Sequence, residues 1–189
     1  MKVVLEGPDN AGKTTLATFL REHTVGVIYN HPGGKPDSPA AEEDCMSAQY
    51  QMASILHRCL LDRVTCISQQ VYNPDPERDW DRQQAAATLL QVPNLVVVYC
   101  RPPNEVLMDV GNFKWRQEET EEHRQKIISR QHEFVERYDT VMQRVPCLHY
   151  NWRDDAHANV LRTKLLQALG GRGDAITWFK DVIAYGSGQ

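Results

Sequence analysis

The residues best suited to chemistry form a glycine-rich stretch, GPDNAGKTTL, directly behind the short apolar run of residues 2–5. From Gly7 to Thr14 it fits the spacing G-x-x-x-x-G-K-[ST] at each fixed position. Backbone N–H groups of such a loop, with the N-terminus of the next helix, bind phosphate oxygens. Lys13 then reaches the β- and γ-phosphates of a nucleotide, and the Thr14 hydroxyl ligates Mg²⁺. The residues expected to contact ATP here are Gly7, Pro8, Asp9, Asn10, Ala11, Gly12, Lys13, Thr14 and Thr15.

Asp9 is a candidate catalytic residue, together with Lys13, because it is a carboxylate inside this Walker A loop. Many phosphate-binding loops carry a neutral residue at its position. A carboxylate there faces the transferred phosphate and is able to accept a proton or to position the acceptor. The alternative is a local hydrogen bond between the carboxylate and the backbone that stiffens the loop.

A second candidate pair is Asp62-Arg63, which follows the apolar residues 59–61. The aspartate can serve as the base for an acceptor or hold a water molecule of Mg²⁺, and the arginine can neutralise a phosphoryl group. An ordinary surface ion pair is the alternative. The position at the end of an expected strand favours a functional role, because ligands of open α/β sheets gather at these ends.

The charged stretch FKWRQEETEEHRQKIISRQ, residues 113–131, has two interpretations. One is a solvated helix with charge pairs four residues apart. The other is a lid, at about residues 111–126, from which an arginine closes over the γ-phosphate. Arg116 and Arg124 are the residues we expect to contact the nucleotide from such a lid.

Apolar segments with the periods of strands and helices alternate along the chain. The expected strands are Val3–Glu6, Val25–Tyr29, Cys59–Leu61, Leu95–Cys100 and Cys147–Tyr150. The expected helices are Lys13–His23, Ala40–His57, Asp79–Gln91, Arg116–Val141 and Asp154–Leu169. This order predicts an α/β fold: a three-layer α/β/α P-loop NTPase with a central parallel sheet of about five strands and a helical lid. We expect one domain over residues 1–169 and a tail over residues 170–189 that forms a packing helix.

Composition limits the remaining classes. A net charge of −4 argues against a general nucleic-acid coat but not against a local basic groove. The apolar runs fall short of the roughly 20 residues that cross a bilayer, so no membrane is expected. The cysteines show no C-x-x-C pair and no zinc-type spacing with histidine, which fits a reducing cytoplasm. Of the tryptophans, Trp80 follows a polar loop, yet burial is the default for so large a side chain.

Four segments in this order resemble the thymidylate kinase family of P-loop kinases. They are VVLEGPDNAGKTTL, HPGGKP, LLDRVTCISQQVY and RQHEFVERYDTVM, and the likeness extends over about residues 1–169. The resemblance implies an ATP- and Mg²⁺-dependent phosphotransferase with a deoxypyrimidine acceptor. It also implies a soluble cytoplasmic enzyme, in the host cytoplasm if a bacteriophage encodes it. The oligomeric state stays open, and a homodimer is compatible with the sequence.

Three departures from the family pattern concern the acceptor. Asn30-His31 replaces an Arg-Glu pair, Val64 replaces an aromatic residue, and residues 37–61 leave room for a single helix. A nucleoside monophosphate carries about two negative charges, which closed sites meet with guanidinium groups. An open site suits a neutral hydroxyl, or a nucleotide within a larger molecule such as a flipped base in DNA.

Three hypotheses follow. Bacteriophage enzymes that phosphorylate 5-hydroxymethyluracil in DNA, a step of thymidine hypermodification, are a subgroup of this family, and the leading hypothesis is an enzyme similar to them. A soluble thymidylate or deoxynucleoside monophosphate kinase is the alternative. The third hypothesis is an ATPase that switches a partner, for which the sequence offers no second nucleotide-switch motif.

Overall fold

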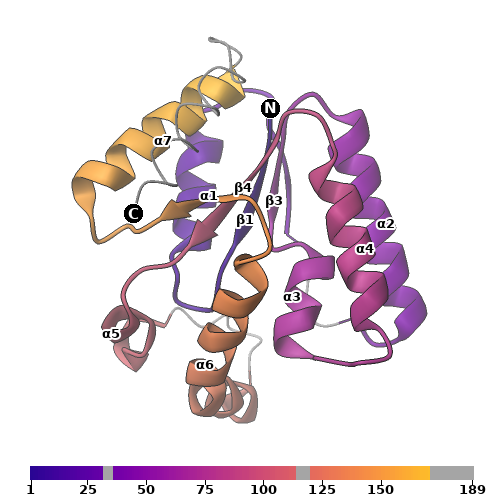
Figure 1. The fold of residues 1–189 in the computed structure, drawn as a ribbon. Helices are drawn as coiled ribbons and strands as arrows, with labels where there is room; N and C mark the ends of the chain where they lie inside the picture. The colour runs from indigo at the N-terminus through magenta and orange to yellow at the C-terminus, as the bar shows by residue number, and fades with distance from the viewer. Residues whose placement is uncertain (32–35, 114–119, 171–189) are drawn as a thin grey trace.

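The computed structural model describes residues 1–31, 36–113 and 120–170, and this part of the chain contains a five-stranded parallel sheet (Figure 1). The strands lie in the order β2-β3-β1-β4-β5. Their bounds are β1 Lys2–Glu6, β2 Ile28–Asn30, β3 Cys59–Asp62, β4 Leu95–Cys100 and β5 Cys147–Tyr150. The predicted fold class is thereby confirmed. Because β1 pairs with both β3 and β4, the loop after β1 lies where the strand order reverses, which is where open α/β sheets bind ligands.

Helices cover both faces of the sheet, so alternate side chains of β1 enter different halves of the core. Val3 and Leu5 pack with α1, Lys13–Glu22, and α7, Asp155–Gly170. Val4 packs on the other side with α2, Pro39–Ile55, and with the helices that follow it. Those helices are α3 Thr65–Tyr72, α4 Asp79–Leu90 and α6 Glu121–Met142. Burial on both faces explains why the strands are apolar at nearly every position.

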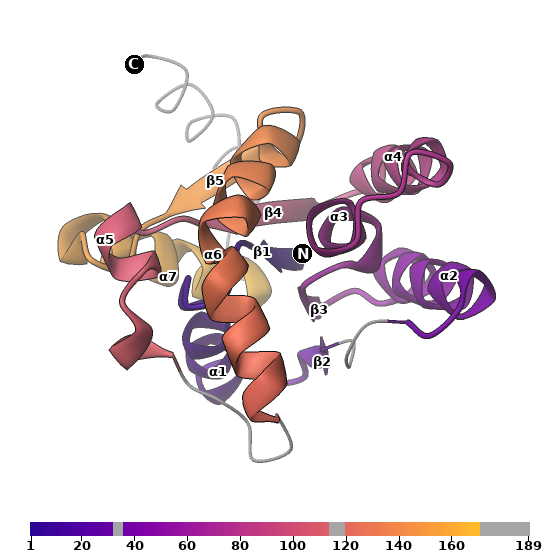
Figure 2. The same cartoon turned by 90° about the horizontal axis from the view of Figure 1, so that it is seen from below.

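Helix α6 crosses in front of the carboxyl ends of the strands when the molecule is seen from below (Figure 2). A short helix α5, Asn104–Leu107, and a 3₁₀ turn, Val110–Asn112, lie between β4 and α6 in the chain. Together with α3, these elements surround the loop that follows β1. They place the ends of the strands inside a framework of helices rather than on an open surface.

Several predicted boundaries change. The second strand begins at Ile28 and not at Val25, because Gly26 turns the chain with a φ of 76° and leaves Val25 exposed. Helices α3 and α5 were not predicted. Arg116, with the rest of residues 114–119 of the expected lid, and the tail from residue 171 lie outside the described residues. No helix in the described ranges has both the length and the apolar character to span a bilayer.

Candidate active site

The loop from Gly7 to Gly12 joins β1 to α1, and its backbone needs glycine at both ends. Gly7 has a φ of 143°, and a Cβ atom there would lie 2.4 Å from the carbonyl oxygen of Cys100. Gly12 has a φ of 84°. Both values lie in a region that other residues rarely adopt, so the two glycines permit the tight path that the motif predicts. The path brings the loop against the end of β4.

Two amide side chains fasten this loop to α5 and α6. Asn10, itself at a φ of 64°, donates from Nδ2 to the carbonyl oxygen of Val106 at 2.7 Å. Gln131 of α6 donates from Nε2 to the carbonyl oxygen of Asp9 at 2.8 Å and to that of Leu107 at 3.3 Å. Neither contact follows from the loop motif. They connect the loop to α5 and to α6, and the first turns of α6 overlap the end of the expected lid.

Lys13 is buried at the start of α1, and its ammonium group lies inside the loop. Nζ donates to the carbonyl oxygens of Gly7 and Pro8, each at 2.6 Å. Burial lowers the pKa of Lys13, and the nearby charge of Arg63 lowers it further. Thr14 and Thr15 follow in the first turn of α1 with exposed side chains.

Asp9 is held by two side chains from the segment after β3. Its Oδ1 accepts from Nη2 of Arg63 at 2.7 Å, and its Oδ2 accepts from the Tyr72 hydroxyl at 3.0 Å. The Arg63 guanidinium also lies over the Tyr72 ring, 4.8 Å from its centroid. Burial would raise the pKa of Asp9, but the charges of Arg63 and Lys13 outweigh it and hold this pKa below its usual value. The carboxylate is therefore ionised and oriented.

The conformation of Arg63 is what allows this contact. Arg63 has a φ of 67°, while its N–H still donates to the Leu5 carbonyl oxygen at 2.8 Å, as a further step of the sheet ladder. Gln49 of α2 supports the same segment, accepting from the Thr65 N–H at 2.8 Å and donating to the Arg63 carbonyl oxygen at 3.4 Å. A left-handed residue of this size costs free energy and indicates a functional position.

Asp62 is the last residue of β3, directly before Arg63, and its side chain contacts residues at the end of β2. Its Oδ2 accepts from the Tyr29 hydroxyl at 2.9 Å and lies 3.2 Å from Nδ1 of His31. The Asp62 side chain is only 1% exposed, whereas that of His31 is 24% exposed. Burial raises the pKa of Asp62, but the His31 hydrogen bond and the Lys13 charge more than compensate, so its pKa is lowered. The two strand ends thus form an aspartate–histidine pair next to the phosphate loop.

Glu6, the last residue of β1, is a third carboxyl group at these strand ends. It is fully buried, and it accepts from the Val64 N–H at 2.5 Å and from the Tyr138 hydroxyl at 3.3 Å. Burial raises the pKa of Glu6 to about 7. Its environment therefore differs from that of Asp9 and Asp62, whose pKa values are lowered.

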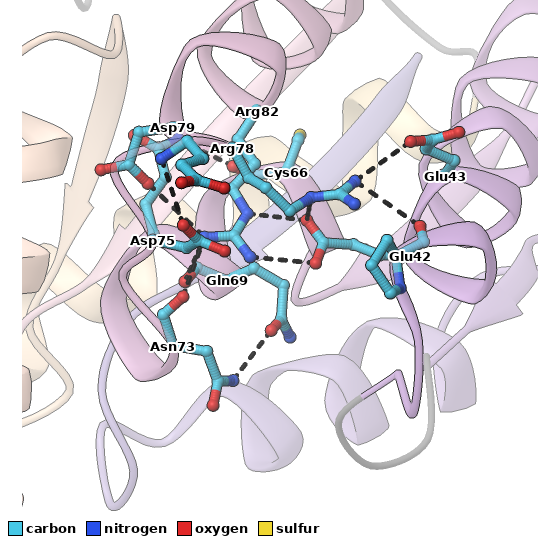
Figure 3. Close-up of polar contacts among 12 residues, drawn as sticks. Glu42, Glu43, Cys66, Gln69, Asn73, Asp75, Arg78, Asp79 and Arg82 are labelled. Carbon is cyan, nitrogen blue, oxygen red and sulfur yellow. Dashed lines mark hydrogen bonds and ion pairs between the residues drawn. The ribbon is translucent and has the colours of Figure 1, made fainter.

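Arg82 of α4 ties α2 to the end of α3 (Figure 3). Its Nε and Nη2 donate to the two carboxylate oxygens of Glu42 at 2.7 and 2.9 Å, and both residues are buried. Its Nη1 donates to the carbonyl oxygens of Asn73 at 2.8 Å and Gln69 at 3.3 Å. Since Tyr72 lies between these two carbonyl groups, Arg82 fixes the turn that carries the hydrogen-bond partner of Asp9.

Among the described residues, Arg101 and Arg124 pair with carboxylates of α6, and Trp80 is exposed. Arg101 follows β4, and its guanidinium is paired with Asp139 of α6 through bonds of 2.8 and 2.9 Å. Arg124 lies in the first turn of α6, 4.0 Å from Glu121. Trp80 is 67% exposed, so the expectation of burial was wrong there. Its position at the start of α4 turns the ring away from the core.

Sequence reasoning assigned no role in this site to four groups. They are the His31 imidazole, whose position after a strand was recognised, the Gln49 and Gln131 amides, and the Trp152 ring. A Cβ atom on Gly12 would lie 2.8 Å from Cδ1 of Trp152, so this ring packs against the phosphate loop. The position of Trp152 just after β5 could have indicated its role, because the carboxyl ends of the strands are where ligands of such sheets bind.

No family model matches the chain, and no curated protein matches it. Among solved structures, deoxyadenosine kinase from M. mycoides with products dCMP and dCDP matches with a TM-score of 0.53 at 14% identity, covering 87% of this chain and 98% of that one. Shikimate kinase from Acinetobacter baumannii in complex with shikimate matches with 0.53 at 19% identity, covering 88% and 90%. The YorR protein from Bacillus subtilis in complex with phosphorylated GDP matches with 0.51 at 16% identity, covering 99% and 96%. The chain therefore shares the fold of these P-loop kinase structures.

Proposed function

We propose that the protein is an ATP-dependent phosphotransferase that moves the γ-phosphate of ATP to a deoxypyrimidine, the acceptor being the 5-hydroxymethyl group of 5-hydroxymethyldeoxyuridine in DNA. The observation that carries the proposal is that the lysine of the phosphate loop lies near the two carboxylates, Asp9 and Asp62, that would face the acceptor. The Lys13 charge lowers the pKa of both Asp9 and Asp62, so the loop ammonium lies within electrostatic reach of both carboxylates. Arg63 completes the set by pairing with Asp9.

On the donor side, the loop amides and Lys13 would bind the phosphates, and Trp152 would lie beside the bound nucleotide. Thr14 would hold Mg²⁺, and its exposed side chain at the helix N-terminus suits that role. Within the described residues no group of three His, Cys, Asp or Glu side chains could bind a metal. A single hydroxyl ligand such as that of Thr14 is appropriate for Mg²⁺, which is bound by one or two protein ligands, phosphates and water. When bound, this ion would offset the charge of the phosphates.

On the acceptor side, the single helix α2 between β2 and β3 agrees with the short link that distinguishes the chain from thymidylate kinases. Asn30 and His31 occupy the place of the family's Arg-Glu pair. Among the described residues, Arg63 supplies the guanidinium at this point. Its Nη2 already donates to Asp9 and to the Tyr72 hydroxyl. Because this guanidinium is already engaged, the described residues favour an acceptor that brings no phosphate charge.

A soluble deoxynucleoside monophosphate kinase is the second candidate. The M. mycoides structure with dCMP and dCDP as products favours it, because that fold accommodates such nucleotides. Under either candidate function, Arg116 and Arg124 would close over the phosphates from the lid.

The test is transfer of label from γ-³²P-ATP to an oligonucleotide that contains 5-hydroxymethyluracil, run beside free dTMP and dUMP. Label on the oligonucleotide is expected, and label on the free nucleotides alone would refute the proposed acceptor. The Lys13→Met variant should lose transfer and keep its circular dichroism spectrum. Lys2→Met is the matched control, since Lys2 lies at the opposite end of β1, where Nζ bonds the Pro93 carbonyl oxygen.

A further inference from the structure

We propose that His31, oriented by Asp62, is the catalytic base that takes the proton of an acceptor hydroxyl; this inference rests on the proposed phosphotransfer at this site. The imidazole lies at the carboxyl end of β2, beside the end of β3. Its Nδ1 is 3.2 Å from Oδ2 of Asp62. An imidazole held by a buried carboxylate through one nitrogen can act as a base through the other.

The three carboxyl groups of the site are poorly placed for this task. Glu6 is fully buried between the Val64 N–H and Tyr138. Both oxygens of Asp9 already accept hydrogen bonds, one of them from a guanidinium. Asp62 is 1% exposed, so an acceptor cannot reach it directly, whereas the His31 side chain beside it is 24% exposed. The exposed member of the pair is therefore the group that can meet an acceptor.

The tautomer of His31 follows from its partner. Asp62 is a carboxylate, and a carboxylate accepts hydrogen bonds only, so Nδ1 must carry the hydrogen. In the neutral ring the lone pair then lies on Nε2. The Tyr29 hydroxyl bonds the same Asp62 oxygen at 2.9 Å and lies beside the imidazole, with ring centroids 6.5 Å apart. These contacts fix both the tautomer and the plane of the ring.

The chemical step is balanced without a further reactant. The acceptor oxygen forms a bond to the γ-phosphorus, and the bond from that phosphorus to the β,γ-bridging oxygen breaks. ADP leaves with the bonding electron pair. The hydroxyl proton moves to Nε2 of His31, and the resulting imidazolium is stabilised by the Asp62 carboxylate. The proton is lost to solvent before the next turnover.

This assignment distinguishes two classes of acceptor. A hydroxyl group keeps its proton at neutral pH and gains from a base in the transition state, typically by about 10²–10⁴-fold. A nucleoside monophosphate is attacked through a phosphate oxygen that is already ionised at pH 7, because its second pKa is about 6. A base held at this point of the site is therefore useful to a kinase for hydroxyl groups and superfluous for a monophosphate.

The pH dependence must be read against the other charges around the dyad. Asp62 of β3 and Tyr29 of β2 face His31 directly. From α1, the Lys13 ammonium acts on Asp62, and the Arg21 guanidinium lies 4.5 Å from the centroid of the Tyr29 ring. Glu6 of β1 also changes charge near neutrality, because burial raises its pKa to about 7. The rates of the variants are therefore compared at the same pH.

The experiment compares wild type with His31→Asn, whose amide retains a donor near the position of Nδ1 but lacks the second nitrogen. Initial rates of label transfer from γ-³²P-ATP are measured between pH 5.5 and 8.5, on oligonucleotides with 5-hydroxymethyluracil and on dTMP, at about unit steps of pH. His132→Asn is the matched control, because His132 forms a similar pair with Glu136 at 3.4 Å on α6 but is 71% exposed.

For the oligonucleotide, we expect His31→Asn to lower kcat by about 10²–10⁴-fold at each pH and to leave the KM for ATP unchanged. If wild type transfers label to the oligonucleotide and His31→Asn does so at a rate within about threefold of wild type, the role of His31 is overturned and the proposed function is left intact. Transfer by wild type to dTMP alone would overturn the proposed acceptor and this inference together. A change in KM for ATP with a kcat within about threefold of wild type would assign His31 a structural role and refute catalysis.

Discussion

Removal of one partner of the buried Glu42–Arg82 pair should destabilise the protein strongly. In Arg82→Met, the Glu42 carboxylate loses both of its short hydrogen bonds and stays buried between α2 and α4. The carbonyl groups of Gln69 and Asn73 lose their donor as well. Breaking such a pair costs about 3–5 kcal/mol. For a chain of this size we expect the melting temperature to fall by about 6–20 °C.

The double variant Glu42→Leu/Arg82→Met separates the ion pair from the packing. Replacing both members of a buried pair by apolar side chains is often nearly neutral, so the double variant should recover at least about 2 kcal/mol relative to Arg82→Met. Recovery should stay incomplete, because each unsatisfied carbonyl group costs about 1–3 kcal/mol. Urea unfolding followed by circular dichroism measures all variants, with the exposed Arg144→Met as control. A loss below about 1 kcal/mol in Arg82→Met, or no coupling in the cycle, would refute this reasoning.

Two further predictions concern the strand ends. Gly7→Ala should abolish ATP binding in calorimetric titration, since its Cβ would lie 2.4 Å from the Cys100 carbonyl oxygen. Gly26→Ala is the control and should bind ATP normally, because Gly26 is also at positive φ but a Cβ there has no atom within 4 Å. Normal binding by both variants would disprove the steric argument. For Glu6, the folded pKa of about 7 lies above the unfolded value of 4.5, so folded protein binds more protons between these values. Its contribution to stability is present below pH 4.5 and is lost as pH rises to 7, by about 1.4 kcal/mol per unit of pKa difference. Urea titrations should show this decline in wild type and not in Glu6→Gln, and parallel curves would contradict it.

The sequence predicted the sheet and the phosphate loop because both depend on local patterns. Apolar runs located the strands, and the loop spacing defined the backbone between β1 and α1. The start of β2 was misplaced because apolarity alone does not show that Gly26 turns the chain. Helix α3 was missed because it is only eight residues long and only two residues separate it from the end of β3, so a helical period is hard to recognise over so short a segment.

The contacts within the candidate site could not be predicted in the same way. Asp9 and Arg63 are 54 residues apart, and their contact depends on the left-handed conformation of Arg63, which no pattern indicates. His31 and Asp62 were both placed at strand ends by the sequence. Their pairing depends on side-chain direction and on the register between β2 and β3. Strand order decides which ends become neighbours, and order is a property of the whole fold.

The charges of the described site favour a neutral acceptor independently of His31. Lys13 and Arg63 contribute two positive charges, and the lowered pKa values of Asp9 and Asp62 give two negative charges that balance them. Glu6 adds only part of a further negative charge near neutral pH, because burial raises its pKa to about 7. ATP brings several more negative charges, which Mg²⁺ and a guanidinium from the lid would have to offset. An acceptor with two further negative charges would need additional cationic groups, whereas the proposed hydroxyl acceptor adds none and would need only a base.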